Sequence, residues 1–416
     1  MLIITILGKI AGQTFRESEL LGNPVTGLMI GVLATVLLQS SSTTTSIIIT
    51  MVGAKLIPLQ NSIPMVMGAN IGTSVTNTIV SLAQSGDRQE FRKAFGGATV
   101  HDMFNWLSVL ILLPLEVATH YLYHLTGAIV ESLNLKESSN YKKDMLKKLT
   151  KPFTNLIVQG NHLFAMTDLS DSVVGAILLV LSLVLIILSL IFIVKLLNSL
   201  LKSPLSKILN RTINAELPGK LAILTGYIAI LVGTGVTMVI QSSSVFTSTL
   251  TPLVGVGILS IDRMLPLTLG ANIGTTLTGI LAALAAPAKA IPDTLRVALC
   301  HLFFNISGVL IFYPIPFMRK APIGLAKLLG NTTAKYRWFS VLYILITFVF
   351  IPSSVFALSL SGPTIFMAIG IPLLSILIII IVINIIQKYR ARILPNFCKH
   401  GIFCHYSCIP CNLMTK

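Results

Sequence analysis

Two polar segments of the same composition could surround an anion. One is Gln39-Ser40-Ser41-Ser42, and the other, in the second half of the chain, is Gln241-Ser242-Ser243-Ser244. Serine hydroxyls donate hydrogen bonds to oxyanion oxygens, and so do the unpaired N–H groups of a helix start, where the helix dipole also favours negative charge. Neither segment contains Lys or Arg. An anion such as phosphate would be bound without permanent cations deep in a low dielectric, which favours its release.

A second motif follows each polar segment at the same distance along the chain. The sequence Gly-Ala-Asn-Ile-Gly-Thr occurs at Gly68–Thr73 and again at Gly270–Thr275. The agreement continues further, because His-x-x-Phe-Asn begins at both His101 and His301. This repetition indicates an internal duplication. Duplicated halves are typical of alternating-access transporters, which hold their substrate near the bilayer midplane where the halves meet.

The same regions carry oxygen atoms of the kind that Na⁺ prefers, since this hard cation is coordinated by amide, hydroxyl, carbonyl and carboxylate oxygens. The predicted sodium ligands are Asn70, Thr73, Thr78, Gln84, Asp87, Asp102, Asn105, Asn272 and Thr275. Asp102 is the most distinctive, because it lies just before a long apolar run, where acids are rare and usually functional. Its counterpart in the second half is Leu302. We therefore expect a cation site in the first half that the second half lacks.

Each motif also has a structural interpretation. A serine-rich segment can cap a helix or join two helices, and small residues in Gly-Ala-Asn-Ile-Gly-Thr allow close helix contact. Asp102 could instead pair with an Arg or with His101, and Asp87 could be a solvated loop acid. His101 and His301 are expected to be structural hydrogen-bond donors. Two copies of each motif at matched spacing favour the functional interpretation of the serine segments.

Composition places these motifs in a membrane protein. The chain is 54% hydrophobic and only 11% charged, far from the balance of a soluble globular protein. Apolar stretches long enough to cross a bilayer include Val173–Val194, Tyr343–Leu360 and Ile365–Ile386. Shorter apolar runs, Pro24–Leu38 and Leu221–Ile240, precede the two serine segments. The predicted fold is an all-α polytopic membrane protein with two inverted repeats, each containing a re-entrant or broken-helix Gln-Ser-Ser-Ser segment.

Charge is concentrated between the spans. The net charge of +16 argues for membrane topology rather than nucleic-acid binding, and it would favour anionic lipid at the inner leaflet. The basic segment Lys195–Arg211 and the tail are assigned to the cytoplasm, whereas Lys136–Lys151 is placed outside. Met1–Leu21 has neither the charged head nor the cleavage site of a secretory peptide.

The chain divides into six parts on this reading. They are residues 1–130, a first transport repeat whose N-terminus is expected to be incomplete; 131–171, a polar extracellular loop; 172–220, a linking span and basic cytoplasmic loop; 221–335, a second transport repeat; 336–387, C-terminal spans; and 388–416, a cytoplasmic tail containing cysteines.

Four cysteines lie in that tail: Cys398, Cys404, Cys408 and Cys411. Cysteines close to a membrane are commonly S-acylated, and we expect this modification here. Unmodified thiols are the first alternative, and zinc bound with His400 and His405 is the second, which lacks a C-x-x-C pair. No cofactor or transition metal is expected. An enzyme is disfavoured as well, since no nucleophile–base pair or His-Glu-x-x-His spacing is present.

These residues resemble a known family, the type II sodium-dependent phosphate cotransporters of solute carrier family 34. The resemblance rests on the paired serine segments, Gly-Ala-Asn-Ile-Gly-Thr, Ala-Thr-Val-His-Asp ending at Asp102, and Ala334–Phe339, and it covers nearly the whole chain. It implies Na⁺-driven uptake of inorganic phosphate at the plasma membrane, typically at an apical epithelial surface. By resemblance, phosphate binds both serine segments, sodium binds Thr78, Gln84, Asp87 and Asn105, and Asp102 contributes to a further sodium site.

The resemblance also implies electrogenic transport of HPO₄²⁻, because family members with an acid at the position of Asp102 are electrogenic and an electroneutral branch has glycine there. Some features depart from the family. The segment Glu131–Asp171 is short and has neither cysteine nor a glycosylation triplet, and Ala271 stands where some members have serine. Two alternatives stay open: a symporter of another oxyanion such as sulfate or arsenate, and an anion channel or receptor without coupling.

Overall fold

The computed structural model describes residues 22–133 and 222–362, together with residues 364–370, 372, 375 and 379. Every regular element in these residues is a helix, as predicted. Four described helices are long and apolar enough to cross a membrane: Arg88–Thr119, Ile261–Leu284, Ile291–Phe312 and Trp338–Leu360. The last confirms the apolar stretch expected at Tyr343–Leu360. The predicted span Val173–Val194, the basic loop after it, the chain start and the cysteine tail lie outside the described residues.

The two halves contain corresponding helices. In the first half these are α2 (Pro24–Leu38), α3 (Ser41–Gly53), α4 (Leu59–Ser81) and α5 (Arg88–Thr119), with the short 3₁₀ helix η2 (Leu82–Gln84) and α6 (Tyr121–Ser132). In the second half they are α10 (Ala222–Ile240), α11 (Ser243–Gly255), α12 (Ile261–Leu284) and α13 (Ile291–Phe312). The chain continues through α14 (Pro316–Lys335), α15 (Trp338–Leu345), the π-helical turn η7 (Ile346–Phe350) and α16 (Ile351–Leu360).

Both serine segments break a helix at their glutamine. Gln39 and Gln241 have φ angles of 54° and 60°, in the left-handed region that non-glycine residues rarely adopt. Helices α2 and α10 therefore end there, and new helices begin two residues later. Ser40 and Ser242 cap those helices by accepting a hydrogen bond from the backbone N–H three residues ahead, at Thr43 and Val245. The predicted break is present in both halves.

Glycines set the crossing of the helices before and after each break. A Cβ added at Gly31 of α2 or Gly68 of α4 would lie 2.0 Å from a carbonyl oxygen of the facing helix. In the second half, a Cβ at Gly270 of α12 would lie 2.0 Å from such an oxygen, and one at Gly233 of α10 would lie 2.4 Å away. The two helix pairs thus touch backbone to backbone at matching positions. Small residues are the usual means of such close approach in membrane helices.

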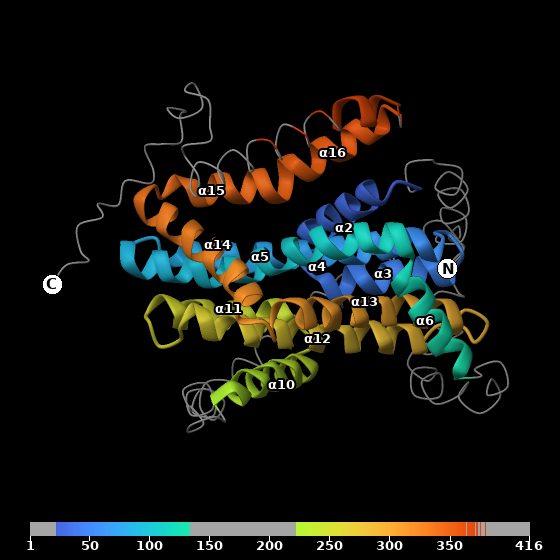
Figure 1. Cartoon of the computed structure of the whole chain (residues 1–416), viewed down its shortest axis with the longest axis horizontal. Coiled ribbons are helices and arrows are strands. Elements are labelled where there is room, and N and C mark those ends of the chain that lie inside the picture. Colours follow the sequence, from blue (N-terminus) through green and yellow to red (C-terminus); the bar gives the residue numbers. More distant parts are fainter. Residues whose placement is uncertain are drawn as a thin grey trace, which may run out of the picture. The chain divides into compact units, whose positions relative to one another are not determined.

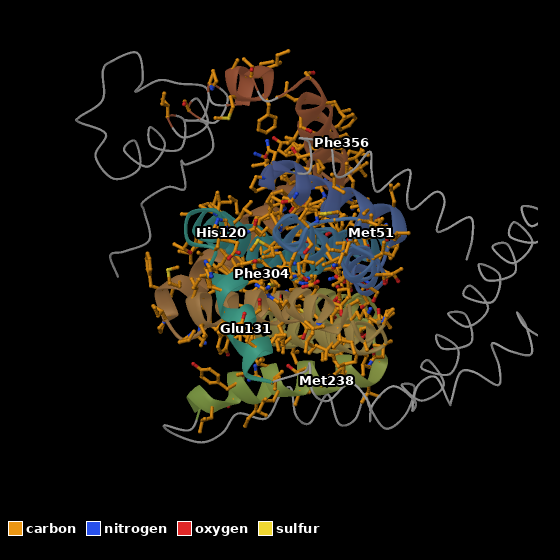
Figure 2. All side chains as sticks on the ribbon, turned by 90° about the vertical axis from the view of Figure 1, so that its right-hand side faces the viewer. Met51, His120, Glu131, Met238, Phe304 and Phe356 are labelled. Carbon is orange, nitrogen blue, oxygen red and sulfur yellow. The ribbon has the colours of Figure 1, made fainter. Side chains whose placement is uncertain are left out.

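The halves are interlocked rather than merely adjacent. Figure 1 shows α4 and α5 running alongside α12 and α13, and α5 contacts α11 and α12 while α13 contacts α3 and α4. Phe104 of α5 accordingly belongs to a buried cluster made mostly of second-half residues. Its counterpart Phe304, labelled near the middle of Figure 2, belongs to a cluster made mostly of first-half residues. Each half therefore lends one helix to the core of the other.

The glycine crossings predict a stability effect that depends on position. Gly31→Ala should lower the melting temperature of the detergent-purified protein, because overpacking at a backbone contact costs about 1–3 kcal/mol. Gly324→Ala is the matched control, since it lies in α14 and a Cβ there meets nothing within 4 Å. That change should stabilise the helix by about 0.5–1 kcal/mol. Equal effects of the two substitutions would contradict the close crossing.

Candidate functional site

Four asparagines and two histidines form a buried polar centre where the halves meet. The side-chain amide of Asn70 donates to Oδ1 of Asn305 at 3.1 Å, and that of Asn272 donates to Oδ1 of Asn105 at 2.9 Å. Asn105 also donates to the backbone oxygen of Asn70 at 2.8 Å, and Asn305 to that of Asn272 at 3.4 Å. Each of these four bonds has its counterpart in the other half. We call these residues, with His101 and His301, the asparagine centre.

The histidines complete this arrangement. Nε2 of His101 lies 2.6 Å from Oδ1 of Asn272, and Nε2 of His301 lies 3.0 Å from Oδ1 of Asn70. Because an amide oxygen only accepts hydrogen bonds, each Nε2 carries the proton. Each imidazole thus bonds to the opposite half, in the structural role predicted for it. The carboxamide oxygens of Asn70, Asn105 and Asn272, predicted as sodium ligands, each accept a hydrogen bond from the other half.

One acidic residue lies beside the asparagine centre. Asp102 is fully buried, and its Oδ2 accepts hydrogen bonds from the hydroxyls of Thr78 at 3.2 Å and Tyr343 at 3.1 Å. Its Oδ1 has no hydrogen-bond partner among the described residues, and no salt bridge is formed with His101 or an arginine there. A buried carboxylate without a positive partner is costly. This geometry disfavours the alternative in which Asp102 is a paired structural acid and fits a cation ligand.

The second half lacks this acidic site altogether. Ile280 occupies the position that corresponds to Thr78, and Leu302 the position that corresponds to Asp102. Both the carboxylate and the hydroxyl that faces it are therefore replaced by apolar side chains. The asparagine centre is duplicated, but the acid beside it is not. The sequence expectation that a cation site exists in one half only is compatible with this difference.

Asn77 is a second polar residue of the first half that the second half lacks. Asn77 of α4 accepts hydrogen bonds from Thr247 at 2.8 Å and Ser248 at 2.9 Å, both in the first turns of α11, and its amide lies 3.4 Å from Nδ1 of His101. The corresponding residue of α12 is Gly279. By the duplication, Thr45 of the first half corresponds to Thr247, and His301 of the second half corresponds to His101. Oγ1 of Thr45 and Nδ1 of His301 are buried without a hydrogen-bond partner in the described part of the chain. Among the hydrogen bonds of the described residues, only those of Asn77 join a side chain of one half to the serine helix of the other.

The glutamines of the serine segments are held by threonines of their own half. Oε1 of Gln39 accepts a hydrogen bond from Thr76 at 3.1 Å, and Oε1 of Gln241 accepts one from Thr278 at 2.7 Å. Both glutamines are exposed, whereas Ser41, Ser243 and Ser244 are buried and Ser40, Ser42 and Ser242 are half-buried. The eight predicted phosphate ligands therefore lie at two equivalent helix starts.

Three consecutive residues of α4 connect these sites. Thr76 contacts Gln39 of the first serine segment, Asn77 contacts the start of the second serine helix, and Thr78 contacts Asp102. Successive helical residues point about 100° apart, so one turn of α4 faces all three neighbours at once. The anion and cation candidates are therefore adjacent to a single helical turn.

Two predicted sodium ligands lie away from this turn. Asp87 precedes α5 and Asp102 lies fifteen positions later, a separation of about 22 Å along a helix that rises 1.5 Å per residue. The exposed Asp87 carboxylate caps α5, and the N–H groups of Glu90 and Gln89 hold its pKa below the usual range. The Gln84 Oε1 is buried without a hydrogen-bond partner among the described residues, close to Gly255 at the end of α11. Asp87 thus has a structural role as the cap of α5, and its role as a sodium ligand stays a prediction.

Thr73 and Thr275 donate hydrogen bonds from their hydroxyls to carbonyls of their own helices, those of Ala69 and Ala271, at 3.0 Å each.

Three residues that sequence reasoning did not single out also contribute to the site: Ser74, Asn77 and Tyr343. Ser74 accepts a hydrogen bond from Asn105 at 3.3 Å and faces the Asp102 carboxylate. The four-residue spacing of Asn70, Ser74 and Thr78 could have revealed it, because such residues share one helix face.

The long apolar helices and the duplicated, interlocked halves around a polar centre define a helical membrane protein of the kind used by secondary transporters. The chain belongs to the Na⁺/Pi-cotransporter family, whose model matches residues 2–113 and 185–351. This confirms the resemblance inferred from the serine segments. The family is one of transporters, in agreement with the prediction that the chain is not an enzyme.

Among its relatives is the sodium-dependent phosphate transport protein 2B of Homo sapiens, which is 47% identical over 94% of this chain and 66% of that protein. The sodium-dependent phosphate transport protein 2A of Oryctolagus cuniculus is 48% identical over 94% of this chain and 69% of its own length. The chain therefore spans about two thirds of the length of these relatives. No solved structure matches it.

The asparagine centre predicts coupled stability effects across the halves. Asn105→Ala and Asn272→Ala should each destabilise the protein by about 1–3 kcal/mol, because each leaves buried polar groups of its partner unpaired. The double variant should lose less than the sum, by a coupling energy of about 0.5–3 kcal/mol. Thermal unfolding of the four purified proteins in detergent measures this cycle. Strictly additive losses would show that the two amides do not bond across the halves.

The position of Asp87 predicts that its charge is dispensable. Asp87→Asn keeps an oxygen that accepts from Gln89 and Glu90, so the melting temperature and the Na⁺ dependence of transport should change little near pH 7. Asp87→Ala removes the cap and should lower the melting temperature. The charged cap is lost only as pH falls through its lowered pKa, well below the assay pH. A large loss of Na⁺ affinity in Asp87→Asn alone would restore its role as a sodium ligand.

Proposed function

We propose that this chain is a sodium-coupled symporter of inorganic phosphate. Its family membership and the printed names of its relatives support this assignment. The structural observation that carries it is the single turn of α4 at which Thr76, Asn77 and Thr78 contact the first serine segment, the second serine helix and Asp102. Anion and cation candidates adjacent to one turn are what coupling of two solutes requires.

The serine segments supply the donors for phosphate. The hydroxyls of Ser40 and Ser242 accept capping hydrogen bonds, which leaves the O–H proton of Ser242 to donate to an anion. The Ser40 hydroxyl is also hydrogen-bonded to the Thr43 hydroxyl at 2.9 Å, and this pair can donate a proton to the same anion. The glutamine oxygens are occupied by threonines, and one hydrogen of each side-chain amide is used by a backbone carbonyl of its own helix. A second amide hydrogen remains for the ligand. With the N–H groups of two helix starts, these donors can bind a tetrahedral oxyanion without Lys or Arg.

The charge of the anion is compensated by the cation that travels with it. Asp102 is the acid placed to bind Na⁺, with Thr78 and Ser74 beside it on α4. The buried carboxylate adds one negative charge to the site, so an additional Na⁺ binds and HPO₄²⁻ enters with net positive charge. Transport is electrogenic on this account. Gln84, Thr73 and Thr275 remain proposed ligands of other sodium ions.

The duplicated halves suggest how the site is exposed to each side in turn. We infer that they are inverted repeats whose broken segments re-enter the membrane from opposite faces and place both serine helices near the midplane. Alternating access would then move one half against the other around the asparagine centre. The family and the apolar helices support a multi-pass protein of the plasma membrane, and we place it at the apical surface of epithelia.

Uptake and current recorded together test this function. Oocytes expressing the chain should take up radiolabelled phosphate only with external Na⁺ and should show an inward current on phosphate addition under voltage clamp. Asp102→Gly should keep uptake and lose the current. Leu302→Gly, the same change at the corresponding position of the second half, should keep both and serves as the matched control.

Competition by sulfate and arsenate in the same assay distinguishes phosphate from other oxyanions. Strong Na⁺-dependent uptake of sulfate with no uptake of phosphate would replace phosphate as the substrate. A current that needs phosphate but not Na⁺ would identify an uncoupled channel. Either result would contradict the proposed function.

A further inference from the structure

Asp102 receives a hydrogen bond from outside the duplicated halves. The hydroxyl of Tyr343 on α15 donates to Oδ2 of Asp102 at 3.1 Å, although α15 has no counterpart among the described helices of either repeat. This helix contacts α4, which also carries Thr78, and the π-helical turn after it contacts α2. Helix α15 and the turn after it thus pack against the half that contains Asp102.

Tyr343 and Thr78 both donate a hydroxyl hydrogen bond to Oδ2 of this carboxylate. Thr78 has a single hydroxyl proton, which is shared between the backbone oxygen of Ser74 at 3.0 Å and Oδ2 of Asp102 at 3.2 Å. The Tyr343 hydroxyl donates to Oδ2 of Asp102, and the side chain of Thr347, one turn further along, is a second hydrogen-bond neighbour of the same hydroxyl. Hydrogen bonds to a charged acceptor are about twice as strong as neutral ones. Tyr343 therefore gives Oδ2 of Asp102 a donor from outside α4, in addition to the hydroxyls of Thr78 and Ser74 on α4.

The ring of Tyr343 is itself held in place by aromatic side chains. Phe95 of α5 and Phe348 of η7 meet it edge to face, with ring centroids 5.8 Å and 6.3 Å away. Both phenylalanines are fully buried. Phe348 lies in the π-helical turn Ile346–Phe350, and such turns are frequent at functional sites. The turn follows Tyr343 by three residues and brings a second ring back onto it.

We propose that Tyr343 is a positioning residue of the cation site at Asp102: its hydroxyl holds Oδ2 and leaves Oδ1 as the carboxylate oxygen that binds Na⁺. The inference rests on the proposed function, because it assigns Na⁺ to Asp102. It adds a requirement that the repeats alone do not contain. The cation site is completed by a helix outside the duplicated halves.

Tyr343→Phe removes one oxygen and keeps the packed ring. We expect the Na⁺ concentration for half-maximal phosphate uptake to rise about 3- to 10-fold, the equivalent of the net contribution of one typical hydrogen bond, with little change in phosphate half-saturation at saturating Na⁺. Tyr313→Phe removes a hydroxyl from another buried tyrosine, which has no contact with Asp102, and should leave the Na⁺ dependence unchanged. In the Asp102→Gly background, Tyr343→Phe should have no further effect on Na⁺.

A binding readout separates this inference from the proposed function. Addition of Na⁺ in place of choline should raise the melting temperature of the purified protein, by less in Tyr343→Phe than in wild type. That result without any phosphate uptake would sustain the inference and overturn the proposed function. Na⁺-dependent phosphate uptake with the same Na⁺ dependence in wild type and Tyr343→Phe would sustain the proposed function and overturn the inference about Tyr343. If Tyr343→Phe unfolds the protein equally with Asp102 present or replaced by glycine, the tyrosine only packs and the proposal fails.

Discussion

The structure depends on hydrogen bonds that side-chain amides exchange between its two halves. Asn70 donates to Asn305 and Asn272 donates to Asn105, all of them buried. In an interior of low dielectric such bonds are strong, and an amide without its partner is correspondingly costly. These hydrogen bonds therefore fix the position of one half relative to the other. Phe104 of the first half packs in a cluster of mostly second-half residues, and Phe304 of the second half packs in a cluster of mostly first-half residues. These phenylalanines add apolar contacts between the same two halves.

Symmetry is broken at the positions where ion coupling would be needed. Thr78 and Asp102 correspond to Ile280 and Leu302, while Asn77 corresponds to Gly279. The first half thus has an acid and a side chain that hydrogen-bonds to the opposite serine helix, and the second half has neither at the corresponding positions. Tyr343 increases the difference, because it adds a hydroxyl to the first half alone. On the proposed function, this one asymmetric polar site in a symmetric frame would allow a duplicated protein to bind two unlike solutes.

Sequence reasoning predicted the helical membrane fold, the duplication and the breaks at Gln39 and Gln241, because these depend on local composition and on turn geometry. Burial of Asp102 was also foreseen from the apolar run that follows it. The partners of Asn70 and Asp102 were not, since Asn305 and Tyr343 are more than two hundred residues away in sequence. The capping of α5 by Asp87 was not foreseen either, because it depends on the residue at which that helix begins.

The central claim is that one phosphate ion is bound by both serine segments. It is tested most directly by modifying Ser40→Cys and Ser242→Cys, each in a background without the tail cysteines, with a thiol reagent of the methanethiosulfonate class. Phosphate added with Na⁺ should slow the modification of both cysteines, and phosphate added with choline should slow neither. Protection of one cysteine alone would contradict a shared site. Protection of neither, in protein that still transports, would place phosphate elsewhere.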